Sequence, residues 1–375
     1  MKKMLQTDRM EQWLILWAVN VLFIWKYMSR TSYSPLIGIV FFSCLFFILS
    51  IVYPRLKNYV SSLLICSLIA TIALIVLLLY KIEPLSVNVD RWSATTYFLD
   101  GLFSGIYPYG IHTHVCETNF PSPFPLWHYV IIPFWLMGDV GIGLIVFLLL
   151  FVGSVNWFTK SHTQTLLVLL LLMISPAYWW EVMVRSDGLS NAILVFCIIL
   201  LMEKNNWSFD KHWIITAIIC GMLASTRLSA IIPVAIYLAR SFFLNSITRQ
   251  IKIILLIALV VFFFFMPYIF WDTENWVFFS RNPFMSQSST GNGWILLLMA
   301  VIAIILALRY RNFQQYTRYT SCFLFLFFCV SLLYNHLVYH SDIPFFEDAD
   351  FDVSYFTLLF PYCLLTITYP KSNSR

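Results

Sequence analysis

Apolar runs recur along almost the whole chain, and they constrain its fold more than any other feature. Hydrophobic residues make up 60% of the 375 positions and charged residues only 11%, whereas about a quarter of an ordinary soluble domain is charged. A run of about 20 apolar residues can cross the hydrocarbon core of a bilayer as a helix. We therefore predict an all-α, polytopic transmembrane helix bundle that forms one domain over residues 1–375, with no separate soluble domain.

Twelve runs are expected to form spans, which places both termini on the same side of the membrane. Several are shorter than usual, and the fourth is long enough to hold a surface helix that ends near Gly138 and Asp139 before a true span begins. The runs cover residues 11–28, 36–53, 60–80, 127–157, 165–181, 189–203, 213–226, 228–240, 251–270, 294–308, 320–338 and 354–369.

The distribution of charge orients these spans. With the N-terminus in the cytoplasm, most of the 23 lysine and arginine residues fall on the inner side, as the positive-inside rule requires. Most acidic residues then fall outside. The net charge of +5 follows from this topology and is no evidence of a nucleic-acid partner.

The longest polar break, residues 82–126, becomes a large external loop. A handful of residues can connect two helices, so its many charged and imidazole side chains favour an active site at the membrane surface over a merely solvated loop. The turn at 182–188, a turn at Arg227, the loop 271–293 and the late acidic loop 339–353 are expected to share this face.

Asp90 and Asp100 are the acidic candidates at the start of this loop. Asp90 lies just above the lipid boundary, where partial desolvation suits a general base; Arg91 beside it opposes that effect, and a helix-capping or solvated aspartate is the alternative. Asp100 is expected in the last turns of an interfacial helix over 91–104, which Gly105 and Pro108 terminate. A plain amphipathic surface helix explains Asp100 equally well.

The order of motifs here carries a family resemblance. The run VDRWSATTYFLDGLFSGIYPY at 89–109 gives Asp-Arg, Asp-Gly and Gly-x-x-Pro-Tyr in turn, and a proline-rich stretch follows at 121–125. It resembles the first external loop of bacterial GT-C superfamily glycosyltransferases, in particular those similar to polyprenyl-phosphate-mannose-dependent mannosyltransferases. The segments 175–196, 220–240, 282–294 and 352–362 resemble later parts of that family. The resemblance implies a GT-C-like fold with Asp90 as the catalytic base.

Arg227 interrupts an apolar run from Ile214 to Leu238 and divides it into two half-length helices. A cation inside such a run is costly unless it reaches water or an anion, so it could bind a lipid-linked phosphate. A snorkelling arginine at a hairpin tip is the alternative. Arg185 with Asp187 could form a local ion pair or extend the same phosphate site, and Arg281 is a third candidate.

Four further residues complete the predicted substrate site. His112 and His114 could contact sugar or phosphate; with Cys116 and Glu117 they could also sketch a metal site, although solvated loop residues are the simpler interpretation. Tyr109 could stack on a sugar, and Gln287 lies in the 282–294 segment. We predict no metal ligand and no cofactor; a divalent cation at the acidic 342–352 segment is an open alternative to a solvated loop.

The leading hypothesis is an inverting hexosyltransferase in the bacterial cytoplasmic membrane. It would move mannose, or another hexose or pentose, from a polyprenyl-phosphate donor to a lipid or glycan acceptor on the periplasmic face, with both termini cytoplasmic. No glycine-rich nucleotide-binding turn is present, which favours a donor held in the lipid phase. The alternatives are a polysaccharide polymerase or ligase, and a transporter or flippase of lipid-linked sugars without catalysis.

Overall fold

The computed structural model describes residues 7–53, 59–288, 292–339 and 352–369, and within these ranges the chain is helical without any β-strand. It divides into two compact units. The first comprises residues 1–78, 148–182 and 311–375, and the second comprises residues 79–147 and 183–310. The all-α prediction is confirmed for the described residues.

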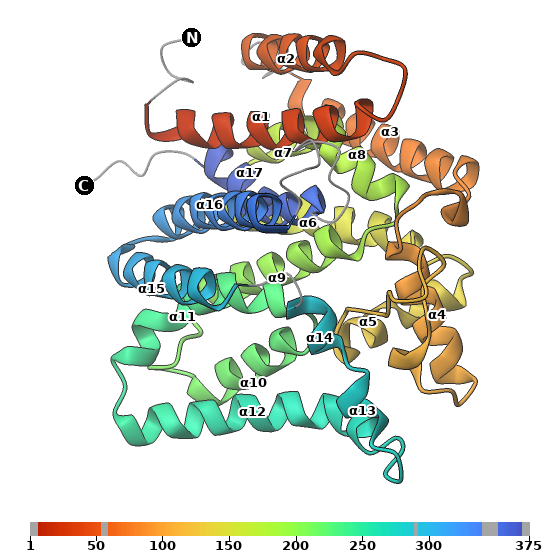
Figure 1. The fold of residues 1–375 in the computed structure, drawn as a ribbon. Coiled ribbons are helices and arrows are strands. Elements are labelled where there is room, and N and C mark those ends of the chain that lie inside the picture. The colour runs from red at the N-terminus through yellow and green to blue at the C-terminus, as the bar shows by residue number, and fades with distance from the viewer. Residues whose placement is uncertain (1–6, 54–58, 289–291, 340–351, 370–375) are drawn as a thin grey trace. The chain divides into compact units, whose positions relative to one another are not determined.

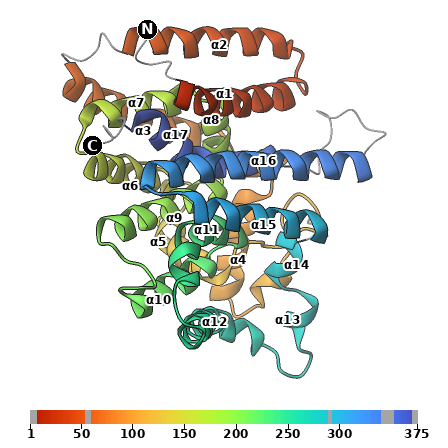
Figure 2. The ribbon, with the colours of Figure 1, turned by 90° about the vertical axis from the view of Figure 1, so that its left-hand side faces the viewer.

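In the first unit, the short helix α17 is buried along its length and packs against α1, α7 and α16. The two N-terminal helices α1 and α2 lie side by side in both views (Figures 1 and 2). The elements of this unit are α1 (Thr7–Met28), α2 (Pro35–Val52), most of α3 (Val60–Lys81), the later part of α6 (Ile142–Thr159), α7 (His162–Met173), α8 (Pro176–Met183), α16 (Phe313–Tyr339), η5 (Val353–Leu359) and α17 (Phe360–Thr368).

In the second unit, α10 packs along α12, α11 packs along α15, and α4 packs on α5 (Figure 1). The helix α9 is buried over most of its length and contacts α11 and η4. The elements are η2 (Pro84–Ser86), α4 (Arg91–Phe103), η3 (Pro108–Gly110), α5 (Pro125–Leu136), α9 (Asp187–Lys204), α10 (Trp213–Ala224), η4 (Leu228–Ala230), α11 (Ile231–Phe243), α12 (Ile247–Ile269), α13 (Val277–Ser280), α14 (Pro283–Ser288) and α15 (Gly293–Arg309).

The long apolar run 127–157 is divided as predicted, into α5 and α6. Pro125 occupies the first turn of α5, where its missing N–H costs nothing. Gly138 follows the helix with φ +102°, a conformation that glycine adopts without strain. The side chain of Asp139 then accepts a hydrogen bond from the N–H of Gly141 at 2.8 Å and shapes the turn into α6.

The predicted interfacial helix is α4. It ends at Phe103, and Gly105 adopts φ +72° immediately beyond it. The N–H of Ile106 returns to the carbonyl of Gly101 at 2.9 Å, which satisfies one of the last carbonyl groups of the helix.

The apolar run around Arg227 is broken as predicted, because α10 ends at Ala224 and α11 begins at Ile231. The turn between them takes hydrogen-bond partners from the start of α5. The N–H groups of Phe124 and Leu126 donate to the carbonyls of Thr226 and Ser225 at 3.0 and 3.1 Å. Non-helical backbone in an apolar setting needs such internal partners.

Among the described residues, five helices are long and apolar enough to cross a membrane: α2, α3, α6, α12 and α16. The pair α7 and α8 passes the same test together but bends by 69°. The segments α10, η4 with α11, α15, and η5 with α17 are apolar but shorter, as their sequences suggested. The chain is thus a helical membrane protein, while the number of twelve spans stays a prediction.

Candidate functional site

A buried ion pair lies within the second unit. The guanidinium Nη2 of Arg227 is 3.3 Å from Oδ2 of Asp187, and both side chains are 6% exposed. Asp187 is the first residue of α9, where the helix dipole favours a negative charge. Arg227 directly precedes η4 and has extended backbone. Both residues were predicted site residues, and the fold brings them together.

This pair is incompletely satisfied. Oδ2 of Asp187 is buried yet accepts no well-directed hydrogen bond from any described residue. The 3.3 Å contact is therefore an ion pair without a well-directed hydrogen bond. Arg227 makes its second contact through the same Nη2 atom, which donates to the hydroxyl of Ser122 at 3.4 Å. A guanidinium carries five N–H donors, and the described contacts engage one nitrogen.

Ser122 and Gln287 tie two distant segments to this pair. The side-chain amide of Gln287 donates to the carbonyl of Ser122 and accepts from the N–H of Leu228, the latter at 2.8 Å. The set Ser122, Asp187, Arg227 and Gln287 is called the Arg227 cluster below. It draws together the 82–126 loop, the 182–188 turn, the Arg227 turn and the 271–293 loop, which were expected to share one face.

His128 of α5 lies near Arg227 and interacts with it electrostatically. It is completely buried and stacks on Phe98, with ring centroids 3.5 Å apart and planes inclined by 7°. Neither ring nitrogen has a hydrogen-bond partner among the described residues. Burial lowers the pKa of His128 from 6.5 to about 3; the nearby Pro123 backbone opposes this shift, and the charge of Arg227 adds a smaller lowering effect.

A small cavity connects Asp187 to α4. Thr95 of α4, Trp127 of α5 and Asp187 line it together with two serines, Ser186 and Ser190, and several apolar residues, and its volume is about 10 Å³. That volume is at the lower limit for one water molecule, so a sugar does not fit there. The cavity nevertheless puts the middle of α4 against the Arg227 cluster.

Asp90 precedes α4 in the N-cap position, and its side chain does not cap the helix. The capping interpretation is therefore wrong for this residue. Asp90 and Arg91 are both half-buried, and no hydrogen bond or ion pair joins the Asp90 carboxylate to any residue within the described ranges. Thr95 is five residues on, about 7.5 Å along the helix axis, so Asp90 lies roughly that far along α4 from the small cavity.

His114 holds the external loop against the start of α4. Its Nδ1 is 2.7 Å from the hydroxyl of Ser93, and its Nε2 is 3.1 Å from the carbonyl of Val87. A serine–histidine contact of this length also occurs in hydrolases, but Ser93 is completely buried and cannot meet a substrate. The contacts of His114 are structural: they hold the 82–126 loop in place next to Asp90.

Arg185 serves a different part of the unit, so the predicted local pair with Asp187 is wrong. Its Nε donates to Oδ2 of Asp139 at 2.8 Å, and its Nη2 donates to the carbonyls of Leu79 and Ile82 at 2.8 and 3.1 Å. These carbonyls lie at the end of α3 and would otherwise be unpaired. Arg185 adopts φ +51°, which turns its side chain toward α3 and away from the Arg227 cluster.

Two other predicted contact residues also have structural roles. Tyr109 is 1% exposed, its hydroxyl donates to the carbonyl of Pro123 at 3.1 Å, and burial raises its pKa well above the usual value. Tyr109 is therefore part of the buried packing of the 82–126 loop and is not available to stack on a sugar. Asp100 is exposed and accepts a hydrogen bond from the indole N–H of Trp135 at 2.9 Å, about 15 Å along α4 from Asp90.

Arg281 and His112 form a second, exposed group around Phe120. The Arg281 guanidinium lies 4.0 Å from the centre of the Phe120 ring, and the His112 ring lies 4.7 Å from it. The hydroxyl of Tyr107 donates to the Arg281 carbonyl at 2.6 Å. This group lies on the loop surface, and no hydrogen bond or ion pair between described residues joins it to the Arg227 cluster.

Sequence reasoning did not place Ser122 or His128 near Arg227, and it did not identify Asp139 as the partner of Arg185. The available signals were a lone histidine and a lone aspartate inside the apolar run 127–157. Within the described ranges, no group of three or more His, Cys, Asp or Glu side chains could hold a metal ion. The late acidic loop, with residues 340–351, lies outside the described residues.

Comparisons of this chain with protein-family models, with curated proteins and with solved structures find no match.

Proposed function

We propose that this protein is a membrane glycosyltransferase that moves a sugar from a polyprenyl-phosphate donor to a lipid or glycan acceptor. Asp90 is the general base. Arg227 is the cation that receives the phosphate of the donor. The reaction takes place at the outer face of the bacterial cytoplasmic membrane, where the 82–126 loop lies under the proposed topology.

The observation that carries this proposal is that the carboxylate of Asp90 makes no hydrogen bond or ion pair with a described residue. It lies at the start of the helix that bears the family-like motif, is half-buried, and neither caps the helix nor pairs with a described residue. An acidic group held in this state is free to accept a proton from a bound hydroxyl.

The incompletely bonded Arg227 supports the phosphate role. Its positive charge is held in place by Asp187, yet its described contacts use only Nη2. An arginine donates charge-assisted hydrogen bonds to phosphate oxygens, and we assign this contact to Nε and Nη1, which lie on different edges of the guanidinium and can each donate to one oxygen. Asp187 then acts as a positioning residue that orients the guanidinium.

The proposed reaction uses Asp90, Arg227 and the two substrates. Asp90 takes the proton of the acceptor hydroxyl while the hydroxyl oxygen attacks the anomeric carbon and forms the new glycosidic bond. The bond from that carbon to the phosphate oxygen breaks, and its electron pair leaves with the lipid phosphate. Arg227 stabilises the charge that develops on this phosphate, and attack from the opposite side inverts the anomeric centre.

The test uses the purified full-length protein in detergent or lipid nanodiscs with radiolabelled polyprenyl-phosphate sugars and membrane-lipid acceptors. Asp90→Asn is expected to lower the transfer rate by about 10²- to 10⁴-fold, the usual contribution of a general base. It should fold like the wild type, because the Asp90 side chain makes no cap.

Asp100→Asn is the matched control, since Asp100 lies on the same helix but bonds to Trp135. We expect its transfer rate to stay within a few-fold of the wild-type rate. Equal transfer by the wild type and Asp90→Asn would remove Asp90 as the base. Movement of intact lipid-linked sugar between leaflets, with no transfer by any variant, would favour the transporter alternative.

A further inference from the structure

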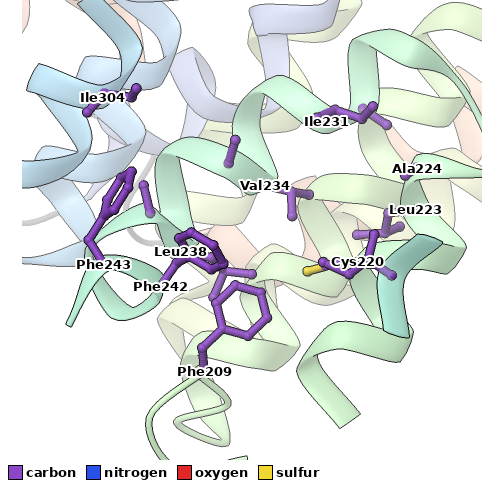
Figure 3. Close-up of a pocket in the computed structure, with 14 residues that line it drawn as sticks. Phe209, Cys220, Leu223, Ala224, Ile231, Val234, Leu238, Phe242, Phe243 and Ile304 are labelled. Carbon is purple, nitrogen blue, oxygen red and sulfur yellow. The ribbon is translucent and has the colours of Figure 1, made fainter. Parts of the chain in front are cut away.

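The acceptor of the proposed reaction needs polar contacts, which the apolar groove along α11 does not offer. This groove has a volume of about 340 Å³ and is lined by apolar side chains and one cysteine, Cys220 (Figure 3). It presents no strong hydrogen-bond donor, so a charged or hydroxylated sugar would lose its hydration there without compensation. The exposed residues around Phe120 have the opposite character.

These residues form one connected surface patch, called the Phe120 group below: Tyr107, His112, Phe120, Trp271 and Arg281. Backbone hydrogen bonds fix one side of it. The N–H of Thr113 donates to the carbonyl of Asn119 at 2.9 Å and closes a turn. His112 and Phe120 flank this turn, and their ring centroids are 4.7 Å apart.

The backbone of Arg281 is held on both sides. Its N–H donates to the carbonyl of Val277 at 3.0 Å, and its own carbonyl accepts from the hydroxyl of Tyr107 at 2.6 Å. The guanidinium lies 4.0 Å from the centre of the Phe120 ring, where a cation is attracted by the face of an aromatic ring. Arg281 is therefore held in place although it is exposed.

The guanidinium of Arg281 is nevertheless without an anion. It makes no hydrogen bond or ion pair with a residue of the described ranges, so its five N–H donors stay available. Asp272, on the same loop, accepts instead from the N–H groups of Glu274 and Asn275. A cation that is already ordered loses less conformational entropy on binding, and a guanidinium matches carboxylate and phosphate oxygens.

The neighbouring side chains suit a sugar ring. His112 is exposed, and its imidazole can exchange hydrogen bonds with a ligand. Trp271 and Tyr107 are half-buried, so part of each ring stays open to stack on the apolar face of a sugar. A sugar that carries an anionic group would use both the arginine and the rings, whereas an inorganic anion would use the arginine alone.

The Phe120 group belongs to the same external loop as Asp90. His114 is two residues after His112, a separation of at most about 7 Å between Cα atoms. It bonds to Ser93 and Val87, which lie three residues after and three residues before Asp90. A sugar chain that is bound to the Phe120 group therefore lies next to the proposed base.

We propose that the Phe120 group binds an acidic sugar of the acceptor, with the carboxylate or phosphate oxygens of that sugar on Arg281 and His112. That the sugar belongs to the acceptor rests on the proposed function. The preference for an acidic sugar rests on the available guanidinium and the open rings. A uronic acid and a phosphorylated sugar share this chemistry, and the experiment compares both with a neutral sugar.

The test measures binding and does not depend on catalysis. Saturation-transfer NMR with full-length protein in phosphatidylcholine nanodiscs gives the affinities of three probes: a disaccharide that ends in glucuronic acid, the matching disaccharide that ends in glucose, and a glucose phosphate. The acidic probes are expected to bind about fivefold more tightly than the neutral one, the upper range for one exposed charge pair. The tighter of the two acidic probes identifies the anionic group.

Arg281→Met removes the guanidinium but keeps an unbranched side chain against Phe120, and we expect it to abolish the preference for acidic probes. Arg281→Lys should keep part of the preference, because its charge remains but the planar donor set is lost. His112→Gln is a second variant on the other side of the ring. It should weaken the binding of the acidic probes more than that of the neutral probe.

Arg30→Met is the matched control. Arg30 is also exposed, and its guanidinium lies 5.6 Å from the centre of the Tyr27 ring, so the same substitution removes the same kind of contact in the first unit. Its preference for acidic probes should equal that of the wild type. Thermal unfolding of every variant checks that a lost preference is not a loss of folding.

Equal affinity of the wild type for acidic and neutral probes, or an unchanged preference in Arg281→Met, would overturn the assignment. Protection of Arg281 from phenylglyoxal by phosphatidylglycerol, but not by the acidic probes, would overturn it too and assign the patch to lipid head groups. Preferential binding of acidic probes without any sugar transfer would keep the subsite and reject the proposed function. Transfer that depends on Asp90 but shows no preference for acidic acceptors would keep the proposed function and reject the subsite.

Discussion

Arg227 and Asp187 meet at 3.3 Å with each side chain 6% exposed, although they lie on segments that are separated by the whole of α9 and α10. Two opposite charges buried this deeply cost free energy to desolvate, and their attraction repays that cost only when geometry and hydrogen bonding are good. Here Oδ2 of Asp187 has no well-directed donor within the described ranges. The pair is therefore better suited to orient a charged group for a ligand than to stabilise the fold.

Removing one partner of this ion pair should lower the stability of the protein. Asp187→Ala leaves the guanidinium of Arg227 buried without a counter-charge, and we expect the free energy of unfolding to fall by about 3–5 kcal/mol. The apolar double variant Arg227→Met with Asp187→Leu should recover most of this loss. Thermal and denaturant unfolding of the two single variants and the double variant measures the coupling, and a double variant no more stable than Asp187→Ala would contradict it.

Arg185 should behave as a structural residue and not as a substrate ligand. Arg185→Gln loses the contact with Asp139 and the bonds to two carbonyls at the end of α3, and charged hydrogen bonds contribute about 1.5–3 kcal/mol each. We expect lower thermal stability with an unchanged KM for the lipid donor. Arg227→Lys should show the opposite pattern, a raised KM with a smaller loss of stability.

Acid should destabilise the second unit through His128. Its folded pKa of about 3 lies below the unfolded value of 6.5, so between these values the unfolded chain binds more protons. Stability then falls as pH drops from 6.5 toward 3. His128→Phe keeps the stacked ring on Phe98 and should flatten this part of the profile of melting temperature against pH. A variant profile as steep as the wild-type profile would show that other groups cause the acid sensitivity.

The helices were predictable because each depends on local signals. Runs of apolar residues indicated where the long helices lie, although they gave no sign of short helices such as α13 and α14. Gly138, Gly105 and the break at Arg227 indicated where α5, α4 and α10 end. The contact between the 82–126 loop and the Arg227 turn agrees with the expectation that these segments share one face.

The partners within the site were not predictable in the same way. Arg185 and Asp187 are two residues apart, yet a left-handed backbone at Arg185 directs it to α3 while Asp187 starts α9 and faces Arg227. His128 lies within an apolar run, where periodicity gives no sign of its orphaned ring nitrogens. The burial of Tyr109 depends on Phe98 and Tyr268, which only tertiary structure brings together.

The short helices on either side of Arg227 also have a consequence for biosynthesis. With 12 and 13 residues, each reaches about 18–20 Å, well short of the roughly 30 Å of a hydrocarbon core. Their turn takes its backbone partners from Phe124 and Leu126, made earlier, and from Gln287, which is 59 positions after Leu228. We therefore expect that a nascent chain which has emerged only as far as α11 still lacks one hydrogen bond of this hairpin, the one from the N–H of Leu228 to Gln287, and gains it only after residue 287 has been synthesised.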